Sequence, residues 1–319
     1  MLSTDILAIV LPIFLLIALG YASAFTGLLR EAVGDGLGQF VNTIAIPVLI
    51  FRTLATASFD GASPWALWGT YFSALAIVWA AASLLSRYLF HREERYCVIA
   101  GISGAFSNTM LVGLPIVSAS FSEAGLVPLF VIVSVHLPFM TVVSTLLMER
   151  AAVADGMQSA RPISVTLRQV ARNLITNPII IGIMAGVAWR MTGMQIPALP
   201  ANVIAQIANA TIPVALFSLG MSLRRYGIRG DLAPAVVTSA LKTIALPAIV
   251  WVSATYVFHL PPLWIQVATL CAACPTGINA YLFAIGFGTG HALSANTISL
   301  TSVFSVISIG VWMHIVGVA

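Results

Sequence analysis

Long apolar stretches constrain this chain more than any other feature. Ten segments of about 20 mostly apolar residues follow one another, at 6–25, 34–53, 65–85, 96–119, 125–148, 174–193, 200–222, 233–258, 263–287 and 292–317. A helix needs about 20 such residues to cross the ~30 Å hydrocarbon core of a bilayer. Because 60% of the residues are hydrophobic and only 8% are charged, a water-soluble domain is excluded. The sequence therefore predicts an all-α polytopic membrane protein with ten transmembrane helices.

The arginines predict the orientation. If the N-terminus is external, Arg52 and Arg190 lie in external loops, and Lys242 lies inside a span. The other basic residues then lie on the cytoplasmic side: Arg30, Arg87, Arg92, Arg95, Arg150, Arg161, Arg168, Arg172, Arg224, Arg225 and Arg229. This asymmetry fits the positive-inside rule. We expect a multi-pass protein of the cell (inner) membrane with both termini external. The net charge of +4 is too small and scattered to indicate nucleic-acid binding.

The two halves of the chain share an internal repeat with an offset of 166 residues. The segment 11–20 (LPIFLLIALG) matches 177–186 (NPIIIGIMAG), and Ile46-Pro47-Val48 matches Ile212-Pro213-Val214. Each half holds five predicted spans, so the second half enters the membrane from the opposite face. Inverted repeats of this kind are typical of secondary transporters.

The fourth span of each half cannot be one continuous helix. Span 4 contains SGAFSNTMLVGLPI (103–116), with Gly113 and Pro115, and span 9 contains CAACPTGINAYLFA (271–284), with Pro275. Proline lacks the N–H of a helical hydrogen bond, and its ring crowds the preceding turn. Both breaks fall close to the bilayer midplane. Irregular backbone is tolerated there only inside protein or beside a wet cavity.

Paired breaks at matching positions favour a binding site at the midplane. Two half-helices would begin there, and their free N–H groups and positive dipole ends favour an anion. The alternative is that proline and glycine merely kink two membrane helices.

These two motifs carry a resemblance to a known family. SNTMLVGLPI and PTGINAYLFA resemble the paired crossover motifs of the auxin efflux carrier family, over essentially the whole chain. The resemblance implies the fold of the bile acid sodium symporters and carboxylate substrates, malonate-like or auxin-like. The residues that map onto the crossover are Asn108 and Thr109, with Pro275, Thr276 and Asn279. The long central loop of the plant members is missing, so their regulation is not carried over.

The resemblance also implies a division of the chain into two bodies. Scaffold helices 1–2 occupy 1–63, core helices 3–5 occupy 64–150, and a cytoplasmic linker with scaffold helices 6–7 occupies 151–230. Core helices 8–10 occupy 231–319. We expect the core to slide against the scaffold in elevator-type alternating access. A homodimer through the scaffold helices is one arrangement compatible with this division.

Three polar residues inside the spans are further candidates for the substrate site. Lys242 lies deep in span 8, where an uncompensated charge costs at least about 2.5 kcal/mol. It either binds the substrate carboxylate, or it snorkels to the cytoplasmic edge or caps carbonyls of a broken helix. Asn42 and Asn209 precede the two Ile-Pro-Val motifs and either face the cleft or bond neighbouring helices.

His136, near the middle of span 5, is a candidate for coupling. It could relay protons, or it could make one structural hydrogen bond. No Asp or Glu lies deep within a span, and a carboxylate often completes a sodium site. We therefore expect sodium-independent transport of a small organic anion, without a cofactor or a bound metal.

An intramembrane serine protease is the competing interpretation. Gly101-Ile102-Ser103-Gly104 matches G-x-S-G, and His136 on the next helix could serve as the base. The motif is weak in a chain with 24 glycines, and proteolysis does not require an inverted repeat.

Overall fold

A computed structural model describes residues 4–56, 63–156, 163–224 and 230–318. Apart from one isolated bridge pair, the regular structure of these residues is helical. The α-helices are α1 (Thr4–Phe25), α2 (Glu31–Phe40), α3 (Ile46–Thr56), α4 (Pro64–Tyr88), α5 (Glu94–Ala105), α6 (Leu114–Ala154), α7 (Ile163–Ile175), α8 (Pro178–Met191), α9 (Ala198–Leu223), α10 (Leu232–Ala240), α11 (Leu246–Val252), α12 (Pro262–Ala273), α13 (Asn279–Phe287) and α14 (His291–Ile315). Four π turns complete the described elements: η1 (Val41–Ala45), η2 (Thr109–Gly113), η3 (Leu241–Ala245) and η4 (Ser253–Val257).

The prediction of an all-α membrane protein is confirmed. Seven helices among the described residues are long and apolar enough to cross a membrane, or eight if the bent pair α7–α8 forms one span. The count differs from ten for two physical reasons. Helices α12 and α13, of 12 and 9 residues, are each too short to cross alone, and spans 4 and 5 meet within one long helical run.

Helix α6 contains the junction between predicted spans 4 and 5. Its 41 residues include Ser122, whose φ of 53° and ψ of −142° are not helical. L-residues with a side chain rarely adopt positive φ, so this residue marks a sharp kink. It lies in the interval between the predicted segments 96–119 and 125–148.

Prolines explain three of the π turns. Turns η1, η2 and η3 each end two residues before a proline: Pro47, Pro115 and Pro247. A proline cannot donate to the carbonyl four residues earlier, and its ring pushes that carbonyl away. At Pro247 the affected carbonyl, Thr243 O, accepts bonds from Ser308 Oγ at 2.9 Å and Trp312 Nε1 at 3.1 Å. Side chains of α14 thus replace the missing backbone donor.

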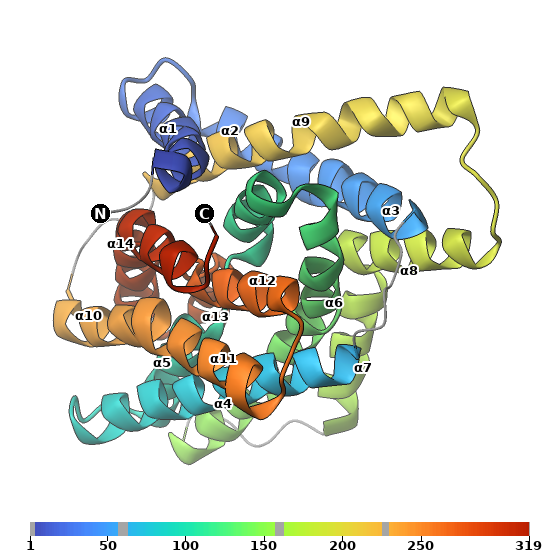
Figure 1. Ribbon diagram of the computed structural model, residues 1–319. Coiled ribbons are helices and arrows are strands. Elements are labelled where there is room, and N and C mark those ends of the chain that lie inside the picture. Colours follow the sequence, from blue (N-terminus) through green and yellow to red (C-terminus); the bar gives the residue numbers. More distant parts are fainter. Residues whose placement is uncertain (1–3, 57–62, 157–162, 225–229, 319) are drawn as a thin grey trace.

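The helices form two groups around α6 (Figure 1). Helices α1, α3, α8 and α9 lie along the top and right of the view, and α4, α5 and α10–α14 lie at the lower left. Glycines permit close packing in the first group. A Cβ on Gly20 of α1 would lie 2.1 Å from Phe217 O of α9, and one on Gly186 of α8 would lie 3.0 Å from Phe51 O of α3. The backbones of these helix pairs therefore touch directly.

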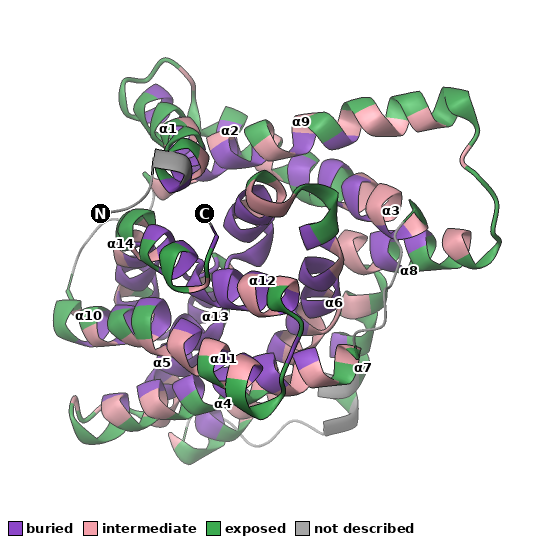
Figure 2. Cartoon of the chain, in the orientation of Figure 1, coloured by how far each residue is buried: buried purple, intermediate pink, exposed green. Residues whose placement is uncertain are grey.

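The second group contains the most deeply buried helices. Figure 2 shows buried residues concentrated at the centre, where α5 and α12 lie. All described residues of α5 from Tyr96 to Ala105 are buried except the half-buried Val98, as are Val267–Ala273 of α12. A helix that is apolar on all sides belongs in an interior. These two helices lead directly to the predicted breaks.

Gly220→Ala should weaken the contact between α9 and α1. A Cβ at Gly220 would lie 2.0 Å from Ile17 O, so the helices must separate. We expect a loss of about 2–3 kcal/mol in stability, seen as a lower thermal midpoint of the purified protein. Gly36→Ala in α2 is the matched control, because a Cβ there meets nothing within 4 Å. Equal midpoints for the two variants would contradict this packing.

Candidate substrate site at the helix crossover

The two predicted helix breaks are present and lie against each other. Helix α5 ends at Ala105 and helical structure resumes at Thr109, whereas α12 ends at Ala273 and α13 begins at Asn279. Cys274 adopts φ −58° and ψ 149°, the extended conformation that a following proline imposes. Local proline chemistry thus ends α12 two residues before Pro275.

The interrupted segments pair as a short antiparallel bridge. Ser107 is opposite Thr276, Asn108 N donates to Pro275 O at 2.8 Å, and Gly277 N donates to Phe106 O at 2.8 Å. These bonds satisfy backbone groups that no helix could satisfy at this depth. The crossover is therefore a defined structure and not a flexible gap.

Thr276 anchors the crossover to its surroundings. Its Oγ1 donates to Ser103 O at 2.7 Å, and its N–H donates to Thr301 Oγ1 at 3.0 Å. Only 1% of Thr276 is exposed. Its hydroxyl and its amide both have partners within the protein, so Thr276 holds the backbone in place and does not face the cavity.

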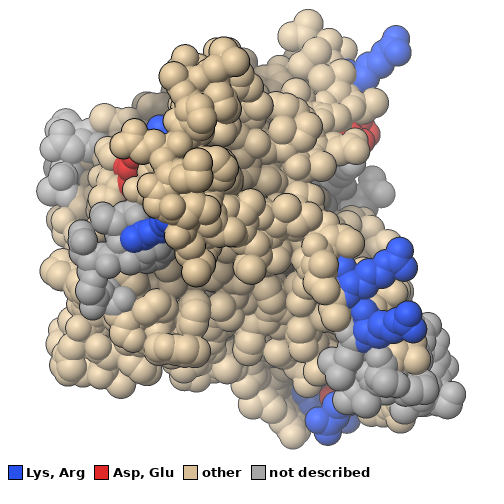
Figure 3. All heavy atoms as spheres, turned by 90° about the vertical axis from the view of Figure 1, so that its right-hand side faces the viewer, with Lys and Arg blue, Asp and Glu red and all other residues tan. Residues whose placement is uncertain are grey.

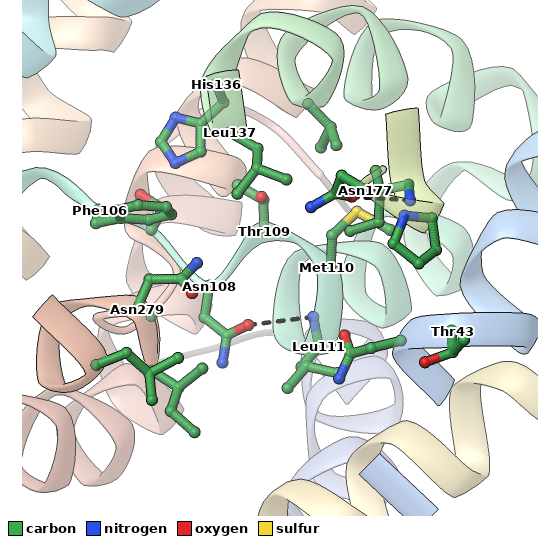
Figure 4. Close-up of a pocket in the computed structure, with 18 residues that line it drawn as sticks. Thr43, Phe106, Asn108, Thr109, Met110, Leu111, His136, Leu137, Asn177 and Asn279 are labelled. Atoms are coloured by element: carbon green, nitrogen blue, oxygen red, sulfur yellow. Dashed lines mark hydrogen bonds between the residues drawn. The ribbon is translucent and has the colours of Figure 1, made fainter. Parts of the chain in front are cut away.

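A cavity of about 420 Å³ lies beside the crossover (Figure 4). Its lining combines apolar side chains with a set of neutral polar residues. The polar residues are Asn42, Thr43, Ser107, Asn108, Thr109, His136, Asn177 and Asn279. None of the described residues that line it is acidic or carries a Lys or Arg side chain. Any charge preference of the cavity must therefore come from backbone dipoles and amide groups.

Two helix N-termini supply that preference. At the first, Asn108 Oδ1 accepts from Leu111 N at 3.2 Å, which leaves its amide NH₂ free to donate (Figure 4). At the second, α13 begins with Asn279 at the cavity wall. The amides of Ala280 and Tyr281 donate to Gly277 O and Ile278 O, so α13 acts on the cavity mainly through the positive end of its dipole and the Asn279 side chain. Two such ends at one cavity favour an anion.

Five of the predicted site residues line the cavity, and the other six do not. Asn42, Asn108, Thr109, Asn279 and His136 line the cavity. Six others lie outside its lining: Gly113, Pro115, Pro275, Thr276, Lys242 and Asn209. Gly113, Pro115 and Pro275 contribute through the backbone. Gly113, for example, allows Cys274 Sγ to approach within 3.1 Å of where a Cβ would stand.

Lys242 caps the end of α12. It is fully buried, and its Nζ donates to Ala272 O at 2.6 Å. The last carbonyls of a helix lack intrahelical donors and carry the negative end of the dipole, so a cation is favourable there. This geometry matches the alternative in which Lys242 caps the carbonyls of a broken helix. Lys242 does not line the cavity, so it would act on a ligand only through the crossover.

Asn209 lies beside an ion pair that joins α3 to α6. Arg52 Nη2 of α3 lies 2.7 Å from Glu123 Oε1, next to the kink of α6, and Arg52 Nη1 donates to Asn209 Oδ1 at 3.5 Å. Asn42 instead donates from its side chain to Gly38 O at 2.8 Å and lies in the cavity wall.

His136 lines the cavity without a hydrogen-bond partner. Its ring is 2% exposed, and both ring nitrogens lack a partner among the described residues. Tyr71 and Phe106 pack edge-to-face against it, at centroid distances of 5.7 and 5.1 Å. A buried neutral imidazole without partners is available as a hydrogen-bond donor or acceptor to a ligand in the cavity.

Sequence reasoning missed Asn177 and Thr43. Asn177 lines the cavity, and its Oδ1 accepts from Ile179 N at 2.9 Å at the start of α8. A signal was present, because the repeat pairs Asn177 with the apolar Leu11. The π turn before Pro47 brings Thr43 to the cavity wall. The spacing of apolar residues does not indicate such a turn.

The start of α5 is held by a nearly buried ion pair. Asp155 accepts from Glu94 N, Arg95 N and Arg95 Nε, each at 3.0 Å, and the Arg95 and Asp155 side chains are 12% and 10% exposed. Burial opposes ionisation of Asp155, but the bonds from the two amides and the guanidinium outweigh it and lower its pKa below 3.8. A lowered folded-state pKa stabilises the fold above the unfolded pKa, and this contribution is lost as the pH falls.

Asp155→Asn should therefore lower stability at pH 7 by about 2 kcal/mol, because bonds to a charged acceptor are lost. The thermal midpoints of wild type and variant should converge as the pH is lowered through 4 and below. A difference that stays constant with pH would mean that the charge of Asp155 is not responsible.

The described residues include no group of three or more His, Cys, Asp or Glu side chains that could hold a metal ion.

The serine protease interpretation lacks the hydrogen bond that would activate its nucleophile. Ser103 is fully buried, and its Oγ has no partner among the described residues.

The family assignment follows from comparison with known proteins. A family model described as membrane transport protein matches residues 5–313. The chain belongs to this family. The family includes the auxin efflux carriers, and its members are membrane transporters and not enzymes.

Relatives align over most of their length. A protein of Rhizobium meliloti (strain 1021) named as a malonate transporter is 24% identical over 308 residues, which cover 96% of this chain and 94% of the relative. Auxin efflux carrier component 8 of Arabidopsis thaliana is 24% identical over 320 residues, covering 86% and 87%. An uncharacterized transporter of Methanothermobacter thermautotrophicus is 24% identical over 311 residues, covering 95% and 96%.

Proposed function

We propose that this membrane transporter carries a small organic anion and that the crossover cavity is its substrate site. The observation that carries the proposal is the meeting of two helix N-termini and the amide groups of Asn108 and Asn279 at one cavity without acidic residues. An anion gains hydrogen bonds and a favourable dipole there. A cation would find no counter-charge among the lining side chains.

A small dicarboxylate is the substrate class that fits best. Each of the two helix ends can receive one carboxylate, and the apolar part of the lining can contact the carbon chain between them. The relative named as a malonate transporter supports this class. An auxin-like aromatic acid, with one carboxylate and a ring, is the alternative substrate within the same family.

The packing of the helices supports an inverted repeat of ten spans. Gly20 meets Phe217 across α1 and α9, and Gly186 meets Phe51 across α8 and α3. Gly186 lies 166 residues after Gly20, and Phe217 lies 166 residues after Phe51, so the repeat relates one contact to the other. On the repeat axis itself, Thr211 Oγ1 donates to Ala45 O, its partner in the offset, at 3.2 Å. Exchange of conformations between such halves produces alternating access.

We propose an elevator mechanism on the basis of this arrangement. In the proposal α4, α5, α6 and α10–α14 move as a core against α1–α3, α8 and α9, which could also form a homodimer contact. With the arginine-rich side cytoplasmic, in the inner membrane, both termini are external. In this orientation Asn177, at the cytoplasmic start of α8, supports a cavity on the inward side. The Arg52–Glu123 pair would join core and scaffold on the external side.

A carboxylate panel tests the substrate class. Malonate and other short dicarboxylates should raise the thermal midpoint of the purified protein in a saturable way, whereas neutral analogues such as the corresponding diamides should not. If only aromatic monocarboxylates stabilise the protein, the auxin-like alternative holds. If no carboxylate does, the proposed site is wrong.

We expect transport without sodium, because no acidic side chain lines the cavity among the described residues. Replacing sodium by choline, at fixed pH and membrane potential, should leave the initial rate of uptake into proteoliposomes essentially unchanged. His136 is the candidate proton carrier, so His136→Gln should reduce uptake driven by a pH gradient more than uptake driven by the substrate gradient alone. A large loss of uptake in choline would refute sodium independence.

A further inference from the structure

Helix α7 has a place in the fold that the transport site does not explain. The segment Arg168–Ile175 precedes α8 with a bend of 61°. Helix α8 has 14 residues and rises about 21 Å, so it needs the residues before it to span the ~30 Å core. Most of α7 lies before the predicted span 174–193 and turns away from α8. The bend is stabilised at Asn177, which caps the first turn of α8.

One side of α7 is held by the protein. Val170 is 5% exposed and Leu174 is half-buried, four residues apart on one face. A second face is polar and uncharged, because Gln169 Nε2 donates to Asn173 Oδ1 at 2.9 Å at the surface. The helix is therefore attached to the protein along one face only.

The third face combines exposed apolar and basic residues. Val165, Arg168, Arg172 and Ile175 follow one another at spacings of three or four, so they form a single stripe, which we call the α7 stripe. Val165 is 56% exposed and Ile175 is 73% exposed, and both arginines are exposed. Figure 3 views the molecule from the side on which α7 lies and shows basic side chains projecting from a face with few other charges.

The charges of the α7 stripe are not neutralised within the protein. Neither Arg168 nor Arg172 forms an ion pair with a described residue. Two arginines flanked by exposed Val and Ile are poorly suited to bulk water, but they suit the boundary between lipid headgroups and acyl chains. There the apolar side chains enter the hydrocarbon edge, and guanidinium groups bind phosphates in a bidentate manner.

We propose that α7 is an interfacial helix whose stripe binds anionic phospholipid headgroups of the adjacent leaflet. The partner is a lipid and not free phosphate, because the apolar members of the stripe require an acyl boundary beside the charge. This inference is independent of the transported substrate.

The test is a lipid titration of the purified full chain in neutral detergent. Phosphatidylglycerol should raise the thermal midpoint in a saturable way, and phosphatidylcholine should not. Each basic residue near a membrane surface contributes roughly a fivefold increase in affinity for anionic lipid, so the double variant Arg168→Gln/Arg172→Gln should bind phosphatidylglycerol about 25-fold more weakly. Arg168→Lys/Arg172→Lys should retain most of the affinity, since the charge remains.

Gln169→Ala/Asn173→Ala is the matched control, because these two exposed residues lie on the uncharged polar face of α7, outside the stripe. It should bind phosphatidylglycerol like wild type, and all variants should share the midpoint of wild type before lipid is added. Unchanged affinity in the double Gln variant would overturn the proposal. So would an equal stabilisation by inorganic phosphate, which would indicate a free-anion site, or by phosphatidylcholine, which would indicate no headgroup preference.

Discussion

Asn108→Asp should weaken carboxylate binding by about 100-fold. The variant keeps the side-chain oxygen that accepts from Leu111 N, so the start of η2 remains capped. It loses the NH₂ donor and places a negative charge at the cavity wall. A like charge about 5 Å from the substrate costs about 3 kcal/mol at an effective dielectric constant of about 20, which corresponds to a factor of about 100 in affinity. Thermal-shift titration with malonate measures the change.

Two further variants separate charge from hydrogen bonding. Asn108→Ala removes the donor without adding a charge and should weaken binding by a factor of roughly 5–10. Asn209→Asp makes the same chemical change beside Arg52, outside the cavity lining, and should leave affinity close to that of wild type. If Asn108→Asp binds malonate as well as Asn209→Asp does, the crossover is not the anion site.

Cross-linking the positions of Arg52 and Glu123 should stop transport almost completely. The two side chains join α3 of the proposed scaffold to α6 of the proposed core, with 2.7 Å between charged atoms. An exposed ion pair contributes only about 0–1 kcal/mol, so it can break in each cycle, whereas a covalent link cannot. The experiment uses Arg52→Cys/Glu123→Cys without the native cysteines, a reducible bifunctional thiol reagent, and uptake before and after reduction.

The control pair lies within the proposed core. Glu93 Oε1 and Thr289 Oγ1 are 3.0 Å apart, and both belong to segments that the proposal moves together. Cross-linking Glu93→Cys/Thr289→Cys should leave transport intact, and reduction should restore transport in the first pair alone. Full activity of the cross-linked 52–123 pair would contradict motion between these two bodies and favour local gating.

The break between α12 and α13 could be located from sequence because its cause is local. A proline removes one donor and crowds one turn wherever it stands, so Pro275 locates this interruption to within a few residues. Pro115 stands ten residues after the end of α5 and accounts for the π turn η2, so it indicates a break in span 4 without giving its position. The long apolar segments were equally informative, since each is mainly helical in the structure. The π turns before Pro47 and Pro247 share this cause, yet their exact form depends on neighbouring side chains such as Trp312.

The direction of each polar side chain could not be predicted in the same way. Asn42 lies five residues before Pro47 and Asn209 lies four residues before Pro213; the first lines the cavity and the second lies with Arg52. Lys242 was recognised as a buried cation, and only the packing of α12 against it identifies Ala272 O as its acceptor. These outcomes depend on tertiary contacts between segments far apart in the chain.

Counterflow of labelled malonate tests the central claim most directly. Proteoliposomes loaded with unlabelled malonate should transiently accumulate external labelled malonate when they contain the wild-type protein. The accumulation should saturate, should be inhibited by other short dicarboxylates, and should be lost with Asn108→Asp but not with Asn209→Asp. The contradicting result is wild-type protein, correctly folded and inserted, that shows no counterflow, or counterflow that Asn108→Asp leaves unchanged.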